Sequence, residues 1–87
     1  MKYAHWDLGV RPAGSVVEVT LQGTEANVRL MTTANFNAFK AGRQHRYHGG
    51  HAKQSPVHLT VPTTDHWYVT VDLGGFAGEV QAAVSVS

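Results

Sequence analysis

The chain contains no cysteine among its 87 residues, which excludes disulfide bonds, thiolate metal sites and a cysteine nucleophile. Charged residues are also scarce, at 15% of the chain, and they nearly cancel to a formal net charge of +1 at pH 7. A charge this small gives no overall steering toward nucleic acid or anionic lipid. Any electrostatic function must therefore be local.

Long apolar runs are absent as well. No stretch approaches the roughly 20 apolar residues of a membrane-spanning helix, and no apolar segment follows Lys2 as it would in a secretory signal peptide. We therefore expect a cytoplasmic protein. The hydrophobic fraction of 43% is nevertheless too high for a disordered chain. At this length the chain can form one hydrophobic core but not two, so we expect one soluble domain over residues 1–87.

The dominant pattern is an alternation of apolar and polar residues, which is typical of strands with one buried and one solvent-facing side. An open sheet of many short strands would leave its edges exposed, so closure is favoured. We expect an all-β fold, either a small antiparallel β-sandwich of jelly-roll-like kind or a partly open barrel, with one short helical turn. The alternating segments are residues 3–8, 16–21, 28–30, 57–61, 67–73 and 80–86.

The inward residues of these strands predict one contiguous core. Its expected members are Trp6, Val19, Leu30, Leu59, Trp67, Val69, Val71 and Val84. Because a slip of one residue turns a strand inside out, inward residues must face inward residues. Aligning them predicts three hairpins with short polar loops. The facing pairs are Leu21 with Ala26, Val61 with Trp67, and Leu73 with Gly78 across the loop 74–77.

The segment from Thr33 to Gly42 breaks the alternation. Phe36 and Phe39 stand three residues apart, as on one side of a helical turn, and Gly42 suits a left-handed stop. Thr33 or Asn35 can cap the start. We expect a short helical turn whose two rings plug one end of the core, with stacking against a ligand as the alternative role of the rings.

Residues 40–53, which we call the basic segment, read KAGRQHRYHGGHAK and hold four of the seven Lys and Arg residues, three of the six His residues and no acid. Gly49-Gly50 is a strong signal for a two-residue hairpin turn. This turn predicts two faces. One face carries Arg46, His48, His51 and Lys53, and the other carries His45 and Tyr47.

The histidines of the basic segment allow more than one interpretation. A zinc site needs convergent ligands, and the predicted hairpin brings only two histidines together, beside cations that repel a divalent ion. Phosphate, sulfate or an acidic partner fits better. The charges could also serve only to keep an edge strand from pairing with a neighbour. The residues expected to bind an anion are Arg43, His45, Arg46, Tyr47, His48, His51 and Lys53.

No catalytic constellation is recognisable in the sequence. No serine stands in a Gly-x-Ser-x-Gly elbow, and the acids are scattered rather than paired. The glycine-rich run 74–78 precedes a strand, whereas phosphate-binding loops precede a helix. We expect no enzyme activity, no catalytic residue, no metal and no cofactor. An outward row of His58, Thr60, Tyr68 and Thr70 is compatible with a sugar-binding face and with ordinary cross-strand pairs.

Two long runs of the chain, residues 16–50 and 55–86, resemble a bacterial domain family of unknown function. Its most specific pieces are residues 27–31, 35–36, 42–47 and 72–75. Members of the family occur alone or fused to other domains, including Toll/interleukin-receptor (TIR) domains. The resemblance implies a small β domain without an established activity. The end of the chain is also similar in architecture to jelly-roll modules of the prepeptidase C-terminal kind.

Together these features favour a non-catalytic binding or interaction module, with the basic segment and the turn around Phe36 and Phe39 as its contact surface. The expected partner is a protein or an anionic ligand, and the small net charge does not favour nucleic acid. The alternative is a small histidine-dependent hydrolase or metal-binding protein. A structural role, in which copies of the chain associate through a sheet edge, also stays open.

Overall fold

The computed structural model describes residues 2–75 and 78–87 and consists of two antiparallel sheets and one short helix. Sheet A contains, in spatial order, β1 (Tyr3–Arg11), β6 (Asp65–Asp72), β3 (Ala26–Thr32) and β4 (His48–Ala52). Sheet B contains β5 (Val57–Thr60), β2 (Val16–Gly23) and β7 (Val80–Val86). The helix is α1 (Thr33–Lys40). The expected all-β sandwich with one short helical element is therefore confirmed.

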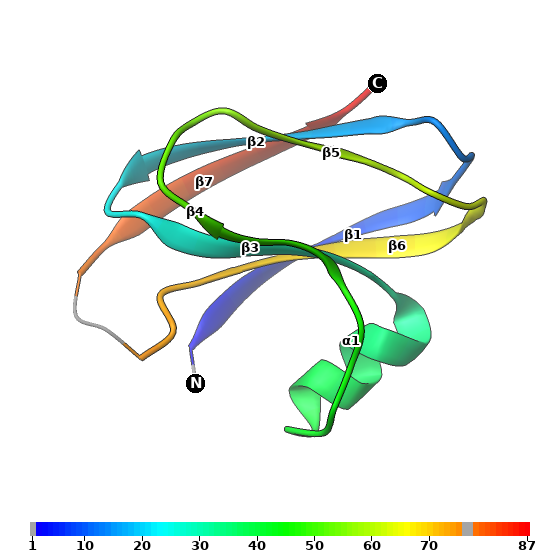
Figure 1. The fold of residues 1–87 in the computed structure, drawn as a ribbon, viewed down its shortest axis with the longest axis horizontal. Coiled ribbons are helices and arrows are strands. Elements are labelled where there is room, and N and C mark those ends of the chain that lie inside the picture. The colour runs from blue at the N-terminus through cyan, green and yellow to red at the C-terminus, as the bar shows by residue number, and fades with distance from the viewer. Residues whose placement is uncertain (1, 76–77) are drawn as a thin grey trace.

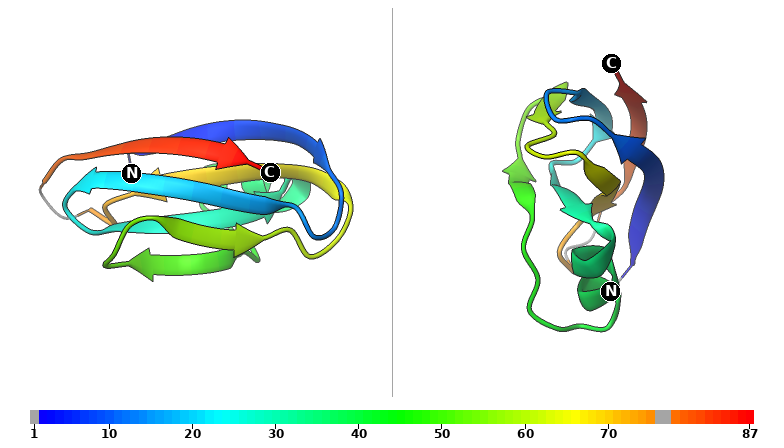
Figure 2. Two further views of the ribbon diagram at one scale, coloured as in Figure 1. Left: turned by 90° about the horizontal axis from the view of Figure 1, so that it is seen from above. Right: turned by 90° about the vertical axis from the view of Figure 1, so that its right-hand side faces the viewer.

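The elements form three layers, in the order sheet B, sheet A and α1 (Figure 1). Apart from the connection through α1, each pair of consecutive strands lies in different sheets, which is a jelly-roll-like feature. Seen from above sheet B, the strands β1 and β7 lie along one side of the sandwich, and β4 and β5 lie along the other (Figure 2). Each side of the sandwich thus presents one edge strand from each sheet.

The three predicted hairpins are wrong. The strands β2 and β3 lie in different sheets, as do β5 and β6, and β6 and β7. Alternation determines which side of a strand is buried, but one inward row can meet another either within a sheet or across the core. A loop of four or five residues spans the roughly 5 Å between strands and also the roughly 10 Å between sheets. Phe76 and Ala77 of the predicted loop 74–77 lie outside the described residues.

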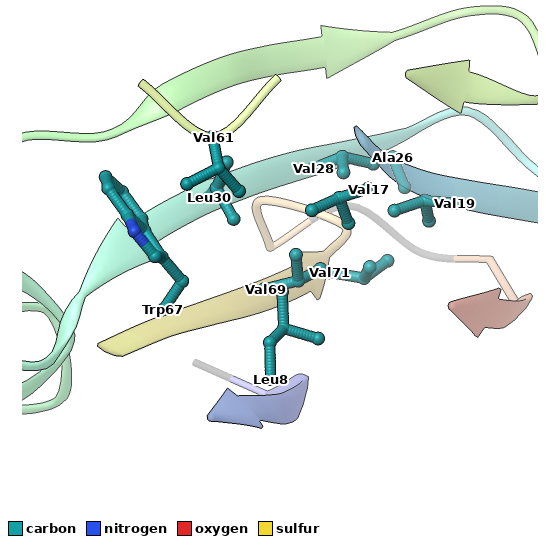
Figure 3. Close-up of a cluster of buried hydrophobic side chains, with 10 residues drawn as sticks. All are labelled: Leu8, Val17, Val19, Ala26, Val28, Leu30, Val61, Trp67, Val69 and Val71. Carbon is teal, nitrogen blue, oxygen red and sulfur yellow. The ribbon is translucent and has the colours of Figure 1, made fainter. Parts of the chain in front are cut away.

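The predicted core is confirmed as one contiguous cluster between the sheets. Figure 3 shows its buried members, with Trp67 at one end. The indole Nε1 of Trp67 donates a hydrogen bond to the carbonyl oxygen of Thr63 at 2.9 Å, so its polar atom is satisfied. Of the predicted members, Val19, Leu30, Trp67, Val69 and Val71 are buried, and Trp6, Leu59 and Val84 are half-buried against them.

The helix α1 does not plug the core, contrary to the prediction. Phe36 and Phe39 are buried with Met31 on the outer face of sheet A. The Phe36 ring stacks on Tyr68 of β6, with the ring centroids 4.4 Å apart. The outward row of β3 contains the apolar Met31, and α1 shields this part of the face from water. Among the described residues, no helix has the length and hydrophobicity to cross a membrane.

The ends of α1 agree with the sequence at one terminus and differ at the other. Gly42 has a φ of 71°, and its N–H donates to the carbonyl of Phe39, which confirms the left-handed stop. The N-cap is Thr32 rather than Thr33 or Asn35. The side chain of Asn35 instead donates from Nδ2 to Oγ1 of Thr32 at 3.0 Å, so it links the helix to the end of β3.

The predicted outward row does not form one surface. His58 and Thr60 belong to β5 in sheet B, whereas Tyr68 and Thr70 belong to β6 in sheet A. Thr70 is also fully buried beneath the outer layer. A sugar-binding face made of these residues is therefore excluded, for the same reason that the β5–β6 hairpin is wrong.

The outer face of sheet A buries a carboxylate. The side chain of Asp72 has no exposed surface, and it forms an ion pair with Nη1 of Arg29. Asn27 donates from Nδ2 to Oδ1 of Asp72 at 3.0 Å, and the backbone N–H of Gly74 donates to the same oxygen at 2.8 Å. Both oxygens of the carboxylate therefore have partners, as a buried charge requires.

Arg29 extends this interaction to the third layer. Its guanidinium carbon lies 5.1 Å from the ring centroid of Tyr47 and 5.9 Å from that of Phe39, within the range of cation–π contacts. Phe39 belongs to α1, and Tyr47 lies in the loop that leads from α1 to β4. The ion pair of Asp72 thus connects sheet A to both the helix and the loop.

The core position of Trp67 leads to the first prediction. We expect Trp67→Ala to lower the free energy of unfolding by about 3 to 5 kcal/mol, because it removes a buried ring and leaves a cavity. Urea denaturation followed by far-UV circular dichroism measures this change. The control Val10→Ala, at a residue that is 69% exposed, should cost less than about 0.5 kcal/mol. Equal losses in the two variants would contradict the inward position of Trp67.

The buried ion pair leads to the second prediction. We expect Arg29→Met to cost about 3 to 5 kcal/mol, because it leaves the carboxylate of Asp72 buried without its cation. The double variant Arg29→Met/Asp72→Leu should recover most of this loss, since neither buried charge remains. Urea denaturation of both single variants and the double variant forms the double-mutant cycle. Additive losses would show that the two side chains are not coupled.

Candidate functional site

The glycine pair of the basic segment lies within a strand and not in a turn, so the predicted hairpin is wrong. Gly49 and Gly50 belong to β4, which pairs antiparallel with β3. Both glycines have positive φ angles, of 106° and 143°. A Cβ at Gly49 would lie only 2.3 Å from the carbonyl oxygen of Val28 on β3. Glycine is required at this position by the close approach of β3, a constraint that the local sequence does not reveal.

Strand pairing separates the two histidines that were predicted to share a face. His48 lies opposite Leu30, which points into the core, whereas His51 lies opposite Asn27 in the outward row of β3. Directly opposite residues in a sheet point to the same side, so His48 and His51 leave β4 on opposite sides. A two-histidine face is therefore absent from β4.

Two open hollows flank β4 and divide the predicted binding residues. The first has a volume of about 560 Å³, and we call it the Arg46 hollow. The second, of about 590 Å³, lies beside β4 and the start of β5 and includes His51 and Lys53. Arg43 lines neither of them. The Arg46 hollow is lined by Thr32, Asn35, His45, Arg46, Tyr47, His48 and Trp67.

Asn35 holds the loop that forms the Arg46 hollow. Its Oδ1 accepts a hydrogen bond of 2.8 Å from the backbone N–H of Arg46, while its Nδ2 donates to Thr32. One amide side chain thus joins the end of β3, the first turn of α1 and the loop. The sequence analysis assigned Asn35 only to helix capping and left Thr32 and Trp67 out of the site. No local signal could have placed them there, because the contacts depend on how the loop folds back over α1.

His45 supports the loop by packing. Its ring lies edge-on to Phe39, with ring centroids 5.2 Å apart, and its Nδ1–H donates to the carbonyl oxygen of Arg43 at 3.0 Å. Its Nε2 is buried and has no hydrogen-bond partner among the described residues. We conclude that His45 shapes the wall of the Arg46 hollow, while Arg46 and His48 are the exposed groups that can reach a ligand.

The Arg46 hollow offers donors and an aromatic wall. Arg46 contributes a guanidinium group, and His48 contributes an imidazole whose ring centroid lies 5.9 Å from that of Trp67. The Nε1 of Trp67 already donates to Thr63, so its indole presents only apolar surface. None of the lining residues is a carboxylate. The hollow is therefore suited to an anionic group rather than to a cation.

The other hollow differs because the fold brings an acid to its histidine. Nε2 of His51 lies 3.4 Å from Oε1 of Glu25, which immediately precedes β3. The expectation that the basic segment has no acid beside it is wrong at this position. Sequence separation hides the contact, since the pairing of β4 with β3 creates it.

Two further histidines also pair with carboxylates, away from the basic segment. Nε2 of His58 lies 3.0 Å from Oε2 of Glu18, and Nε2 of His66 lies 2.6 Å from Oδ1 of Asp7. The backbone N–H of Gly9 and the side chain of His66 hold the pKa of Asp7 below its usual range. The charged form of Asp7 therefore favours the folded state, and this small contribution is lost as the pH falls through the lowered pKa.

No metal centre is formed by the residues that the structure describes, since no three His, Asp or Glu side chains come together as ligands. We predict that zinc added to the protein changes its melting temperature little. A site filled at 100 times its Kd would add about 2.7 kcal/mol, which raises the melting temperature of a chain this small by about 10 °C or more. Differential scanning fluorimetry checks this. A rise of that size that disappears in His48→Ala would overturn the prediction.

Comparison with known proteins gives a family but no activity. The search of curated proteins and the search of solved structures found no match. One family model, described as Domain of unknown function (DUF1883), matches residues 1–87. The expected membership of a domain family of unknown function is thereby confirmed. Since the match extends over the whole chain, the chain belongs to the DUF1883 family.

Proposed function

We propose that this domain is a non-catalytic binding module that holds a small anionic group in the Arg46 hollow. The observation that carries the proposal is the lining of this hollow, which combines Arg46 and His48 and contains no carboxylate. Arginine binds phosphate, sulfate and carboxylate groups through paired N–H donors, and an imidazole adds a further donor. Such a cluster without acids favours an anion over any other small ligand.

The surroundings of the hollow support the proposal because they hold the binding loop in place. The backbone of Arg46 is tied to Asn35, and the ring of the next residue, Tyr47, lies against the guanidinium of Arg29. Arg29 is in turn held by the buried Asp72. A loop that is ordered before binding loses less conformational entropy when the ligand arrives.

The lining also suggests the kind of ligand. A volume of about 560 Å³ lies within the range of small-molecule sites. The indole of Trp67 and the ring of Tyr47 provide apolar surface beside the two donors. We therefore propose a small molecule that carries a phosphate or sulfate group on a flat or apolar body, with the charged group on Arg46 and His48.

The hydrolase alternative has less support. A histidine that acts as a general base needs an acidic or carbonyl partner to orient it and a nucleophile within reach. His48 has no such partner among the described hydrogen bonds, and the histidines that do have carboxylate partners lie elsewhere. The proposed role in protecting an edge strand fits Lys53 better, because it directly follows β4 at the edge of sheet A.

A binding screen with matched variants tests the proposal. Phosphorylated, sulfated and neutral small molecules are titrated into the wild type by isothermal titration calorimetry. We expect anionic hits that weaken as the salt concentration rises, since exposed charges are screened over about 8 to 10 Å at physiological ionic strength. The double variant Arg46→Ala/His48→Ala should bind these hits at least about tenfold more weakly, because it loses two hydrogen bonds to a charged group.

The control is Arg43→Ala/His51→Ala, which removes the same two residue types from the same segment but leaves the Arg46 hollow intact. We expect its affinity to stay within about threefold of the wild type, as only distant, screened charges are lost. Equal losses in the two double variants would show that binding depends on diffuse charge. An unchanged affinity in Arg46→Ala/His48→Ala would place the site elsewhere.

A further inference from the structure

Four strands lie at sheet edges, and three of them carry features that hinder pairing with another chain. The strand β1 has a register shift between Asp7 and Gly9. The strand β5 has only four residues and lies between Pro56 and Pro62, and β4 has five residues and is followed by Lys53. Bulges, shortness, proline and lysine are the usual protection of edge strands.

The fourth edge strand, β7, has none of these features. It extends over seven residues, VQAAVSV, which include no charged residue, no proline and no glycine. Among the described residues, β7 pairs with β2 on one side only. A long, uncharged edge of this kind is a template for another strand. This edge does not involve the Arg46 hollow.

The hydrogen bonds to β2 show which groups of β7 are free. Just beyond its end, Ser87 and Val16 exchange two backbone hydrogen bonds of 3.0 Å each. Because antiparallel strands alternate between bonded and non-bonded pairs, Ser85, Ala83 and Gln81 also direct their N–H and C=O groups toward β2. The intervening residues direct theirs toward the open edge. These residues are Val80, Ala82, Val84 and Val86.

We propose that two copies of this chain associate by pairing their β7 strands antiparallel about a two-fold axis at Ala83. This register places Val80 opposite Val86 and Ala82 opposite Val84, and so pairs all the free N–H and C=O groups of both edges. The core-facing residues of one copy then meet the core-facing residues of the other. The strand is its own complement, as an isologous interface requires.

The alternatives to this register are poorer. A shift by one residue would put the core-facing row of one copy opposite the solvent-facing row of the other. A shift by two residues would leave free groups at the ends of both strands without partners. On the outer face, Ala83 would lie opposite Ala83 and Gln81 opposite Ser85. These side chains are small or neutral, so neither bulk nor charge opposes the pairing.

A charge exchange at the axis tests the proposal. Light scattering coupled to size-exclusion chromatography should show the wild type at twice the 9.4 kDa chain mass and shifting toward the monomer on dilution. Ala83→Lys and Ala83→Glu should each raise the dimer Kd at least about tenfold, because two like charges then lie opposite each other. An equal mixture of the two variants should restore the dimer. The control Thr60→Lys adds the same charge to β5, at the other edge of sheet B, and should leave the mass unchanged.

Crosslinking gives a second readout, because the chain has no cysteine of its own. Two Ala83 residues at the axis form a non-hydrogen-bonded pair, whose Cα atoms lie about 4.5 Å apart in an antiparallel ladder, within the range of a disulfide. Under mild oxidation, Ala83→Cys should therefore form a covalent dimer much faster than Thr60→Cys. Circular dichroism verifies that each variant is folded.

Three results would overturn the proposal. The first is a wild type that stays at the monomer mass at every concentration tested, even if its β7 edge captures a strand of a different protein. The second is a dimer that persists unchanged in Ala83→Lys, which would place the interface on another surface. The third is equal crosslinking of Ala83→Cys and Thr60→Cys.

Discussion

The buried carboxylate of Asp72 is the constraint on which the outer layers of this domain depend. A charge without solvent contact must be paired and hydrogen-bonded, and Arg29, Asn27 and the backbone of Gly74 meet this requirement together. The pairing of β3 with β6 brings Asn27 and Asp72 opposite each other. Arg29 then places its cation where the rings of Phe39 and Tyr47 can cover it. The ion pair thus links the register of sheet A to the position of α1.

The Arg46 hollow is a consequence of the same chain of contacts. Tyr47 is held by Arg29, the backbone of Arg46 is held by Asn35, and His48 begins the strand β4 beside the core residue Trp67. The exposed donors of the proposed anion site therefore stand on a loop that is fixed at both ends. The open edge β7 lies on the other side of the sandwich, beside β1 (Figure 2). A dimer through β7 would leave the hollow open to solvent, so binding and association can operate independently.

The candidate site illustrates why only part of it could be predicted. The cations and histidines of the basic segment are visible in the sequence, and Arg46 and His48 indeed share one hollow. The pair Gly49-Gly50, however, is a local turn signal that the β3–β4 ladder overrides, because Gly49 is needed for the close approach to Val28. The positions of Asn35 and Glu25 beside the segment depend on long-range contacts. Spacing along the chain carries no information about such contacts.

The sequence by itself determined the strands, the helix with its glycine stop, and the residues of the core, since these follow from local periodicity and local conformational preference. Only the tertiary structure decided which strands are neighbours. An alternating pattern states which side of a strand is buried but not whether its partner lies beside it or across the core, so the expected hairpins became crossings between sheets. The same ambiguity put α1 over the outer face, where Met31 and the buried ion pair needed cover from water.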